Sequence, residues 1–265
     1  MSITSGTVRL EVAGAVATIV LDRPEAMNAL TVPLKTALLD VVQQVHHDPA
    51  VRAVVLTGSG RAFCVGQDLR EHAALLDAGD PAPLATVREH YNPIVTLLAT
   101  MPKPVVAAVN GTAAGAGLGL ACACDFRIGA QGARWTTAFT GIGLTADSGL
   151  SFTLPRLVGA AKAMALLLLA EPFTTDQAFE MGLLTAVVPQ ERVLPAAQEL
   201  AARLAAGPTV AYAAVKRCLH VAATSTLEQA LAEEDRQQTL AGRSSDHAAA
   251  VRSFLDKQVP VFQGR

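Results

Sequence analysis

The sequence predicts an α/β fold that continues into a helical C-terminal region. Up to residue 192, apolar runs ended by turn residues alternate with segments of helical periodicity, as in an α/β core. From residue 193 onward the pattern is almost entirely helical. A chain of 265 residues is long enough for one large core with an appendage. We therefore divide it into a core, 1–192, and a helical oligomerisation region, 193–265.

The first strand–helix–strand unit covers residues 16–60. VATIVLDRP, at 16–24, and VRAVVLTGSG, at 51–60, are rich in β-branched side chains and end in turn residues. Residues 32–49 between them carry apolar side chains at helical spacing: Leu34, Leu38, Val41, Val42 and Val45.

Further strands and a small-residue helix follow in the core. KPVVAAVNG, at 103–111, and DFRIGA, at 125–130, are predicted strands on either side of the helix AGLGLACAC, at 116–124. TAVVP, at 185–189, is the last predicted strand. Strands thus alternate with helices throughout this part of the chain.

Helix-start signals mark the second half of the chain. Thr174 and Gln177 have the spacing of a capping box, which predicts that a helix begins there. Gly-Pro, Thr-Ser-Thr and Arg-Ser-Ser-Asp breaks then separate four predicted helices: 196–208, 210–222, 227–242 and 247–257.

Composition favours a small-molecule enzyme that forms oligomers. The net charge of −2 and the pI near 6.3 produce no long-range field for a nucleic acid or an anionic membrane. Hydrophobic residues make up 51% of the chain and charged residues only 17%, so we expect other subunits to cover part of the surface.

Several features indicate a cytoplasmic protein. MSITSGTVRL lacks a basic segment followed by an apolar one, and the best apolar run, 157–170, is too short to span a bilayer. The four cysteines have no C-x-x-C spacing and lie in apolar contexts, as core thiols of a reducing compartment do. The six histidines show no ligand spacing, so we expect no metal site.

Two glycine-containing stretches are candidates for chemistry. GTAAGAGLGLACACD, at 111–125, lacks the spacing of a nucleotide-binding loop, but the N–H groups of Ala116 and Gly117 at a helix start can hold an anion. In GRAFCVGQDL, at 60–69, Gly66 permits close backbone approach, and the N–H of Val65 can join that of Ala116 in an oxyanion hole. The alternatives are tight helix packing for the first stretch and an ordinary turn for the second.

The segment 72–93 is polar and broken by Pro and Gly, so it is either a lid over a pocket or an ordinary surface helix and loop. Between Glu89 and Glu171 the chain has only two acidic residues, Asp125 and Asp147. Asp147 is either the N-cap of the helix that follows or a proton-transfer group, because apolar surroundings raise the pKa of a carboxyl.

Together these stretches resemble the crotonase (enoyl-CoA hydratase/isomerase) superfamily. The resemblance covers essentially the whole chain through LDRPEAMNAL, RAFCVGQDL, KPVVAAVNGTAAGAGLGLACACDFRIG, GLTADSGLSFTLPRLVG, EMGLLTAVVP and FLDKQVPVFQGR. It implies a spiral ββα core that binds an acyl-CoA thioester, with the N–H groups of Val65 and Ala116 on the thioester oxygen. It also implies a helical trimerisation region, in a homotrimer or a hexamer. Coenzyme A then enters as part of the substrate, and no separate cofactor is expected.

The resemblance also exposes two departures. The two glutamates of the hydratases correspond to Gly119 and Phe139, which makes ordinary hydration doubtful. In the isomerase branches an aspartate within GL-x-x-D-x-G transfers the proton, and GLTADSG places Asp147 at that position. FCVGQDL and HYNP look most like the epoxyphenylacetyl-CoA isomerases of phenylacetate catabolism. By carry-over, the coenzyme A contacts are Arg23, Ala62, Gln67, Asp68, Leu69, Phe254 and Lys257, the last two from a neighbouring subunit. The other predicted binding positions are Gly66, Gly117, Phe139 and Tyr91, and Tyr91 either lines the acyl pocket or is a buried structural residue.

Three hypotheses follow. The first is an enoyl-CoA isomerase in which Asp147 moves a proton beside the oxyanion hole. The second is an enoyl-CoA hydratase in which Asp147, or a carboxylate such as Glu71, just before the segment 72–93, or Glu89 within it, activates water. The third is an acyl-CoA-binding trimer without catalysis. The sequence leaves the acyl chain open.

Overall fold

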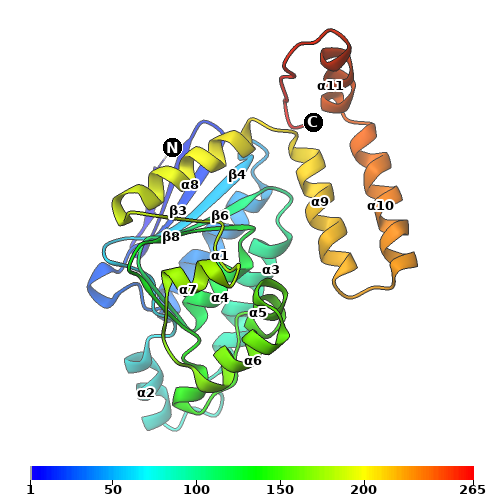
Figure 1. Ribbon diagram of the computed structural model, residues 1–265. Helices are drawn as coiled ribbons and strands as arrows, with labels where there is room; N and C mark the ends of the chain where they lie inside the picture. The colour runs from blue at the N-terminus through cyan, green and yellow to red at the C-terminus, as the bar shows by residue number, and fades with distance from the viewer. Residues whose placement is uncertain (1) are drawn as a thin grey trace.

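Two β-sheets with helices around them form the body of the protein, and three C-terminal helices project from it (Figure 1). A computed structural model describes the backbone of residues 2–265 and the side chains of residues 6–265. The large sheet has seven strands in the order β1-β2-β3-β4-β6-β8-β11. Their bounds are Ser2–Ser5, Val8–Ala13, Val16–Leu21, Ala53–Gly58, Val105–Val109, Phe126–Ala130 and Ala186–Val188. In this sheet β3, β4, β6, β8 and β11 run parallel, and β1 and β2 add an antiparallel edge that we did not predict.

A smaller sheet of four strands, in the order β10-β9-β7-β5, lies beside the large one. These strands, of two or three residues each, are Phe173–Thr174, Arg134–Thr136, Thr112–Ala114 and Ala62–Cys64. Each of β5, β7 and β9 follows directly on a strand of the large sheet. The pairs β4-β5 and β6-β7 then lead into helices α2 (Leu69–Asp77) and α4 (Ala116–Ala123), which makes the repeated ββα unit that the resemblance implied.

Both faces of the large sheet are covered. In β4, Val54 and Leu56 point into the main core cluster, where α1 (Val32–His47) and α3 (Asn92–Thr100) pack, whereas Ala53 and Val55 point into a second cluster. Strands covered on both faces are largely apolar, and every residue of VATIVL and AVVLTG is buried, which is why these runs show no polar alternation. The second cluster is formed by this face of the sheet and helix α8.

Helix α8 (Gln190–Ala205) buries Val193, Ala197 and Ala201 against the large sheet. This helix crosses the position at which we divide the chain, between residues 192 and 193. The division therefore stays a prediction, and the first turns of the C-terminal helical pattern belong to the packed body of the protein.

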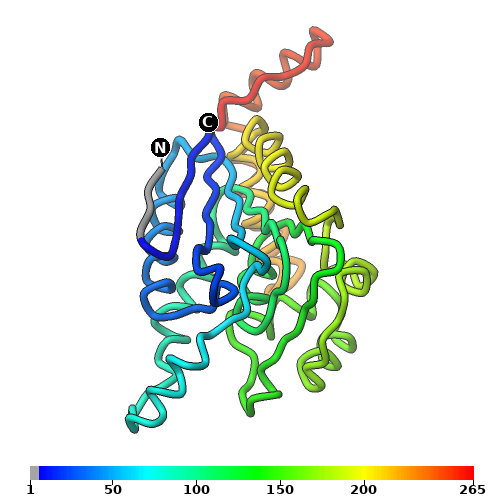
Figure 2. The backbone as a smooth tube through the Cα atoms, turned by 90° about the vertical axis from the view of Figure 1, so that its left-hand side faces the viewer, coloured from blue at the N-terminus to red at the C-terminus, as the bar shows by residue number. Residues whose placement is uncertain are grey.

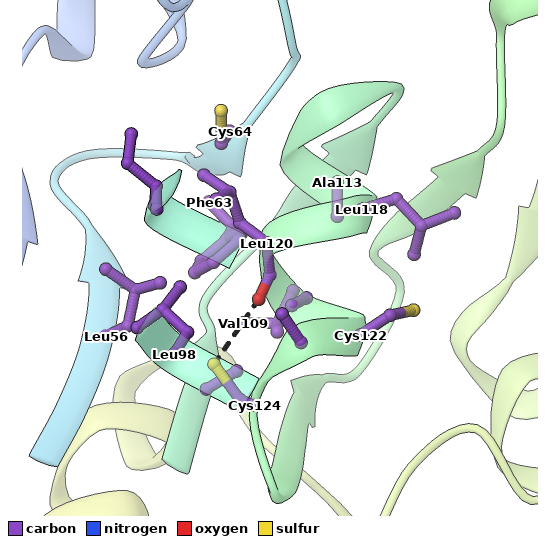
Figure 3. Packing of buried hydrophobic residues seen from close by; sticks show 14 of the residues in the cluster. Leu56, Phe63, Cys64, Leu98, Val109, Ala113, Leu118, Leu120, Cys122 and Cys124 are labelled. Carbon is purple, nitrogen blue, oxygen red and sulfur yellow. Dashed lines mark hydrogen bonds between the residues drawn. The ribbon is translucent and has the colours of Figure 1, made fainter. Parts of the chain in front are cut away.

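Helix α4 packs against β5 and β7 of the small sheet and against helices α3 and α5, with Leu118 and Leu120 in the main core cluster (Figure 3). A Cβ on Gly117 would lie 2.2 Å from the carbonyl oxygen of Cys64, so only glycine permits this approach of α4 to β5. The thiol of Cys124 donates a hydrogen bond to the carbonyl of Leu120, 3.3 Å away.

The cysteines are free thiols, and three of them are core residues as predicted. Burial raises the pKa of Cys64 and Cys124 to about 12 and that of Cys122 to about 11, so these thiols are unreactive at neutral pH. Cys218 differs from the prediction, because it lies on a projecting helix and is only half-buried.

Helices α9 (Thr209–Ala222), α10 (Leu227–Gly242) and α11 (Ser245–Leu255) stand to one side of the sheets in Figure 1, and α11 extends beyond the body in Figure 2. Their positions confirm the predicted helices. An ion pair of 2.7 Å between Lys216 and Asp125 ties α9 to the body of the protein. Within residues 2–265, no helix combines the length and the apolar character needed to cross a bilayer.

The remaining helices are α5 (Leu150–Val158), α6 (Ala160–Leu169) and α7 (Thr175–Glu180). Helix α7 begins at the predicted capping box, in which Thr174 accepts from the N–H of Gln177 and the Gln177 side chain accepts in return.

Candidate active site

An apolar cavity lies where the turns after β5, β7 and β9 meet. Eight of the residues predicted for the site line it: Val65, Gly66, Gln67, Leu69, Tyr91, Ala116, Phe139 and Asp147. Eight more line it that we did not single out: His72, Leu84, Thr86, Val87, Gly115, Ala138, Ile142 and Leu144. Because strands of one sheet deliver these turns to a single place, residues distant in the sequence share one cavity.

The turn after β5 is held from beneath by Asn28. This fully buried side chain donates hydrogen bonds of 2.9, 2.9 and 3.1 Å to the carbonyls of Ser59, Ala62 and Phe63. Its own carbonyl accepts from the backbone N–H of Arg23, 2.9 Å away. One asparagine therefore fixes the approach to the turn that carries Val65, Gly66 and Gln67.

The backbone of this turn presents N–H groups toward the start of α4. Leu30 pairs with the carbonyl of Gly66 and the N–H of Asp68, so the N–H of the residue between them, Gln67, faces the opposite side. Gly66 has φ +87°, and a Cβ there would lie 3.3 Å from the nitrogen of Ala116. The turn thus packs closely against the first residue of α4.

Helix α4 begins without a side-chain cap, after Gly115 with φ +51°. Among the described residues, no turn or loop hydrogen bond uses the N–H of Val65, Gln67 or Ala116. These groups are the candidate donors to a ligand oxygen, as in an oxyanion hole. Gln67 is a donor candidate that the sequence analysis missed, since only the pairing with Leu30 shows which way its N–H points.

Asp147 is the acidic residue of the cavity, and it does not cap the helix that follows. Gly149 is the N-cap of α5 and no side chain caps that helix. The Asp147 carboxylate accepts a 2.7 Å hydrogen bond from the hydroxyl of Ser148, a buried residue with φ +51°. Burial raises the pKa of Asp147, and the Ser148 hydroxyl and the charge of Lys35 only partly oppose that shift.

The two positions that carry glutamates in the resembled hydratases are occupied differently. A Cβ on Gly119 would lie 2.5 Å from the Cβ of Ser148, so a side chain there would collide with the segment that carries Asp147. Phe139 lines the cavity with an apolar ring. The cavity therefore has neither the carboxylate from α4 nor the one from the turn after β9.

Residues 72–93, which the sequence left open as a lid or an ordinary surface segment, line one side of the cavity. His72, Leu84 and Val87 line it from α2, the following loop and a π-helical turn, Val87–Tyr91. Of the two other carboxylates considered for water activation, Glu71 accepts from the N–H of Val32 at the start of α1, and Glu89 pairs with Arg88 on the surface. Neither carboxylate lines the cavity.

A buried lysine behind the cavity is the main feature that sequence reasoning missed. Lys35 has no exposed surface, and its ammonium donates a 3.1 Å hydrogen bond to the side-chain oxygen of Gln67. The hydroxyl of Tyr91 donates to that same oxygen, and the ammonium lies 5.2 Å from the centre of the Tyr91 ring. Burial lowers the pKa of Lys35, while the carboxylates of Glu71 and Asp147 oppose the shift. The sequence did contain a signal for this burial, because Lys35 lies on the same apolar face of the predicted helix as Leu38.

Six predicted binding residues lie outside the cavity lining: Arg23, Ala62, Asp68, Gly117, Phe254 and Lys257. Asp68 caps α2 by accepting from the N–H groups of Arg70 and Glu71, and it pairs with Arg23 at 3.1 Å. Ala62 and Gly117 are packing positions. The coenzyme A contacts assigned to these residues stay predictions. Among the described residues, no group of three or more side chains is placed to hold a metal ion.

Repeated ββα units around an apolar cavity, lined by one half-buried carboxylate and by the first residue of a helix, define an α/β enzyme of the crotonase fold. The family model for enoyl-CoA hydratase/isomerase matches residues 11–265, and the chain belongs to that family. The resemblance read from the sequence is therefore confirmed.

Relatives of known sequence or structure agree with this assignment. The chain is 42% identical over 252 residues to a 1,2-epoxyphenylacetyl-CoA isomerase of Escherichia coli K12, covering 94% of this chain and 95% of that protein. It is 44% identical over 260 residues to a Rhodobacter capsulatus protein named "Probable enoyl-CoA hydratase", covering 98% of each. A crystal structure from Mycobacterium abscessus, assigned to the hydratase/isomerase group, is similar with a TM-score of 0.94 at 48% identity, over 97% of this chain and 100% of that one. The chain is an acyl-CoA enzyme of this family, with similarity to both activities.

Proposed function

We propose that this protein is an enoyl-CoA isomerase that shifts a double bond by proton transfer through Asp147. The observation that carries the proposal is the solitary carboxylate. Asp147 is the one acidic side chain among the described residues that line the cavity, and burial raises its pKa. A single base with a raised pKa suits the removal of a proton from one carbon and its return to another.

The reaction balances with one carboxylate and no water. Starting from a 3-enoyl-CoA, the Asp147 carboxylate removes a proton from C2, and the electron pair moves onto the thioester oxygen. The N–H of Ala116 and one N–H of the turn, from Val65 or Gln67, stabilise that oxyanion. The carboxyl group of Asp147 then returns the proton to C4, which leaves the double bond between C2 and C3.

Hydration is the second candidate, and the 44% identity to a protein named as a hydratase is the observation that favours it. In that case Asp147 would have to activate water and protonate carbon without a second carboxylate from the cavity lining. The isomerase relative at 42% identity supports the first candidate in the same degree. The contents of the cavity, rather than the identities, are what supports isomerisation in this proposal.

Supplying both 2-enoyl-CoA and 3-enoyl-CoA thioesters separates these functions. We expect 3-enoyl-CoA to gain the absorbance of the conjugated thioester, with no 3-hydroxyacyl-CoA in the products. In deuterium oxide, the α-proton should exchange in the wild type and not in Asp147→Asn. Loss of conjugated absorbance from 2-enoyl-CoA with formation of 3-hydroxyacyl-CoA would establish hydration instead. Tight binding without any exchange would establish an acyl-CoA-binding protein.

We also propose that the projecting helices join copies of this chain. Val215, Leu219 and Leu231 are each more than half exposed and line one groove between α9 and α10, and a contiguous exposed apolar surface marks an interaction site. Phe254 is 82% exposed and does not line the cavity of its own chain, so with Lys257 it is available to a neighbour. Light scattering after size-exclusion chromatography should give the mass of a trimer or hexamer, and a monomer would contradict this.

A further inference from the structure

The side-chain amide of Gln67 is held in one orientation. Its oxygen accepts from the ammonium of Lys35 at 3.1 Å and from the hydroxyl of Tyr91. An ammonium group has only donors, so the atom that faces Lys35 must be the amide oxygen and not the nitrogen. Lys35 is itself fully buried, which keeps water from competing for this contact.

The opposite end of the amide is therefore directed away from Lys35. Gln67 is half-buried and lines the cavity. Its NH₂ group makes no hydrogen bond with any described residue, and it is not among the buried polar atoms that lack a partner. A hydrogen-bond donor in a fixed direction is thus open to the cavity.

We propose that this NH₂ group binds an oxygen atom carried by the acyl group of the substrate. The chemical class is a coenzyme A thioester whose acyl part contains an ether, epoxide or keto oxygen close to the thioester end. The position follows from the chain, since the Gln67 side chain starts at the turn whose backbone N–H groups face Ala116. The distance between the backbone N–H groups of the turn and the side-chain NH₂ group is therefore set by the length of the Gln67 side chain.

Selectivity follows from the lining of the cavity. Leu84, Val87 and Phe139 offer no acceptor to the amide, so a hydrocarbon acyl group would displace water from the NH₂ and leave it unpaired. An oxygen at the right place restores that hydrogen bond. Gln67 thus acts as a specificity-determining residue, and Lys35 positions it.

This inference rests on the proposed acyl-CoA function, and its test uses ligands that cannot isomerise. We choose hexanoyl-CoA and its analogues 3-, 4- and 5-oxahexanoyl-CoA, in which an ether oxygen replaces one methylene. Titration calorimetry gives the ratio of the Kd for hexanoyl-CoA to the Kd for each analogue. We expect a ratio above one for at least one analogue in the wild type.

Three variants test the origin of that ratio. Gln67→Leu removes the donor at similar volume and should lower the ratio by about tenfold, the effect of one hydrogen bond. Gln67→Glu keeps the shape but offers only acceptors, so the ratio should fall below one. Lys35→Met frees the amide to turn and should also reduce the ratio, to a smaller extent than Gln67→Leu.

Lys103→Met is the matched control for removal of a buried lysine. Lys103 is 4% exposed and donates to the carbonyls of Val45 and Asp48, away from the cavity. This variant should lose stability and leave the ratio unchanged. If Lys35→Met fails to fold, the two Gln67 variants still decide the question.

The possible failures are distinguishable. If no acyl-CoA binds, the proposed function is wrong. If hexanoyl-CoA binds and the ratio is one for every analogue, or does not respond to Gln67→Leu, the role of the amide is overturned while the isomerase proposal stands.

Discussion

Gly119 and Ser148 are in direct contact, so that a Cβ added to Gly119 would lie 2.5 Å from the Cβ of Ser148 and 2.8 Å from its carbonyl oxygen. Ser148 in turn donates a 2.7 Å hydrogen bond to the carboxylate of Asp147. Helix α4 therefore supports the segment that carries Asp147 through a residue that has no side chain. The place where the resembled hydratases carry a carboxylate is filled here by Ser148.

Gly119→Ala should destabilise the protein by about 1–3 kcal/mol, because the added methyl group overpacks a rigid backbone contact. Gly119→Glu should disturb Asp147 and lower isomerase activity without producing a hydratase. Denaturant unfolding and the two enoyl-CoA assays measure these effects. Gly242→Ala is the control, since a Cβ on that helical glycine meets nothing within 4 Å and should be neutral or stabilising. Equal stability of both alanine variants would contradict the contact.

Asp147→Asn should fold normally and lose about 10²–10⁴-fold in kcat, because the amide cannot accept and return a proton. Ser148→Ala removes the 2.7 Å hydrogen bond and should change the pH profile more than the maximal rate. The pKa of Asp147 should rise in that variant, since the Ser148 hydroxyl now lowers it. Near-normal double-bond migration in Asp147→Asn would remove this residue from the mechanism.

The pKa of Asp147 also predicts how stability depends on pH. Because burial raises the pKa above 3.8, the folded state binds the proton more tightly than the unfolded state. The contribution of Asp147 to stability is therefore greatest in acid and declines as the pH rises through the raised pKa. Asp147→Asn should be at least as stable as the wild type at neutral pH and lose that advantage in acid. Thermal unfolding of both proteins across the acid range measures the difference, and a constant gap would contradict the shift.

The sequence predicted the parallel strands and the helices because their signals are local. Runs such as AVVLTG and the capping box at Thr174 follow from propensity and backbone chemistry within a few residues. The second sheet was not visible from patterns alone, since β5, β7, β9 and β10 are at most three residues long. Only the resemblance implied the ββα repeat that contains them.

Those residues of the candidate site that lie in short local motifs could also be predicted. Asp147 and Ala116 were found through their motifs, and the structure places both at one cavity. Lys35 was missed because a lysine on an apolar helix stripe is read as a surface residue, and its partner Gln67 is 32 positions away. The direction of the Gln67 N–H depends likewise on a pairing with Leu30, a contact that no local pattern encodes.

Asn28 should be a major stabilising residue of the turn before the cavity. It has φ +57°, and its amide donates to three carbonyls. Asn28→Gly tolerates that φ and should still cost on the order of 3 kcal/mol, since buried carbonyls lose their donor. Asn28→Ala should cost more because it adds left-handed strain. Both variants should weaken acyl-CoA binding, and wild-type unfolding midpoints in both would show that the amide does not hold the turn.

Ala116→Pro tests the oxyanion hole with little disturbance of the fold. Ala116 is the first residue of α4, a position where proline is tolerated because its N–H has no partner within the helix. Loss of this one donor should reduce turnover of any thioester by about 10²–10³-fold, whichever group moves the proton. Ala160→Pro is the matched control, because Ala160 is exposed, begins α6 and also follows a glycine. Both variants should melt close to the wild type, and only Ala116→Pro should lose activity. Unchanged turnover in Ala116→Pro would take the start of α4 out of the mechanism and leave the oxyanion to the turn after β5 alone.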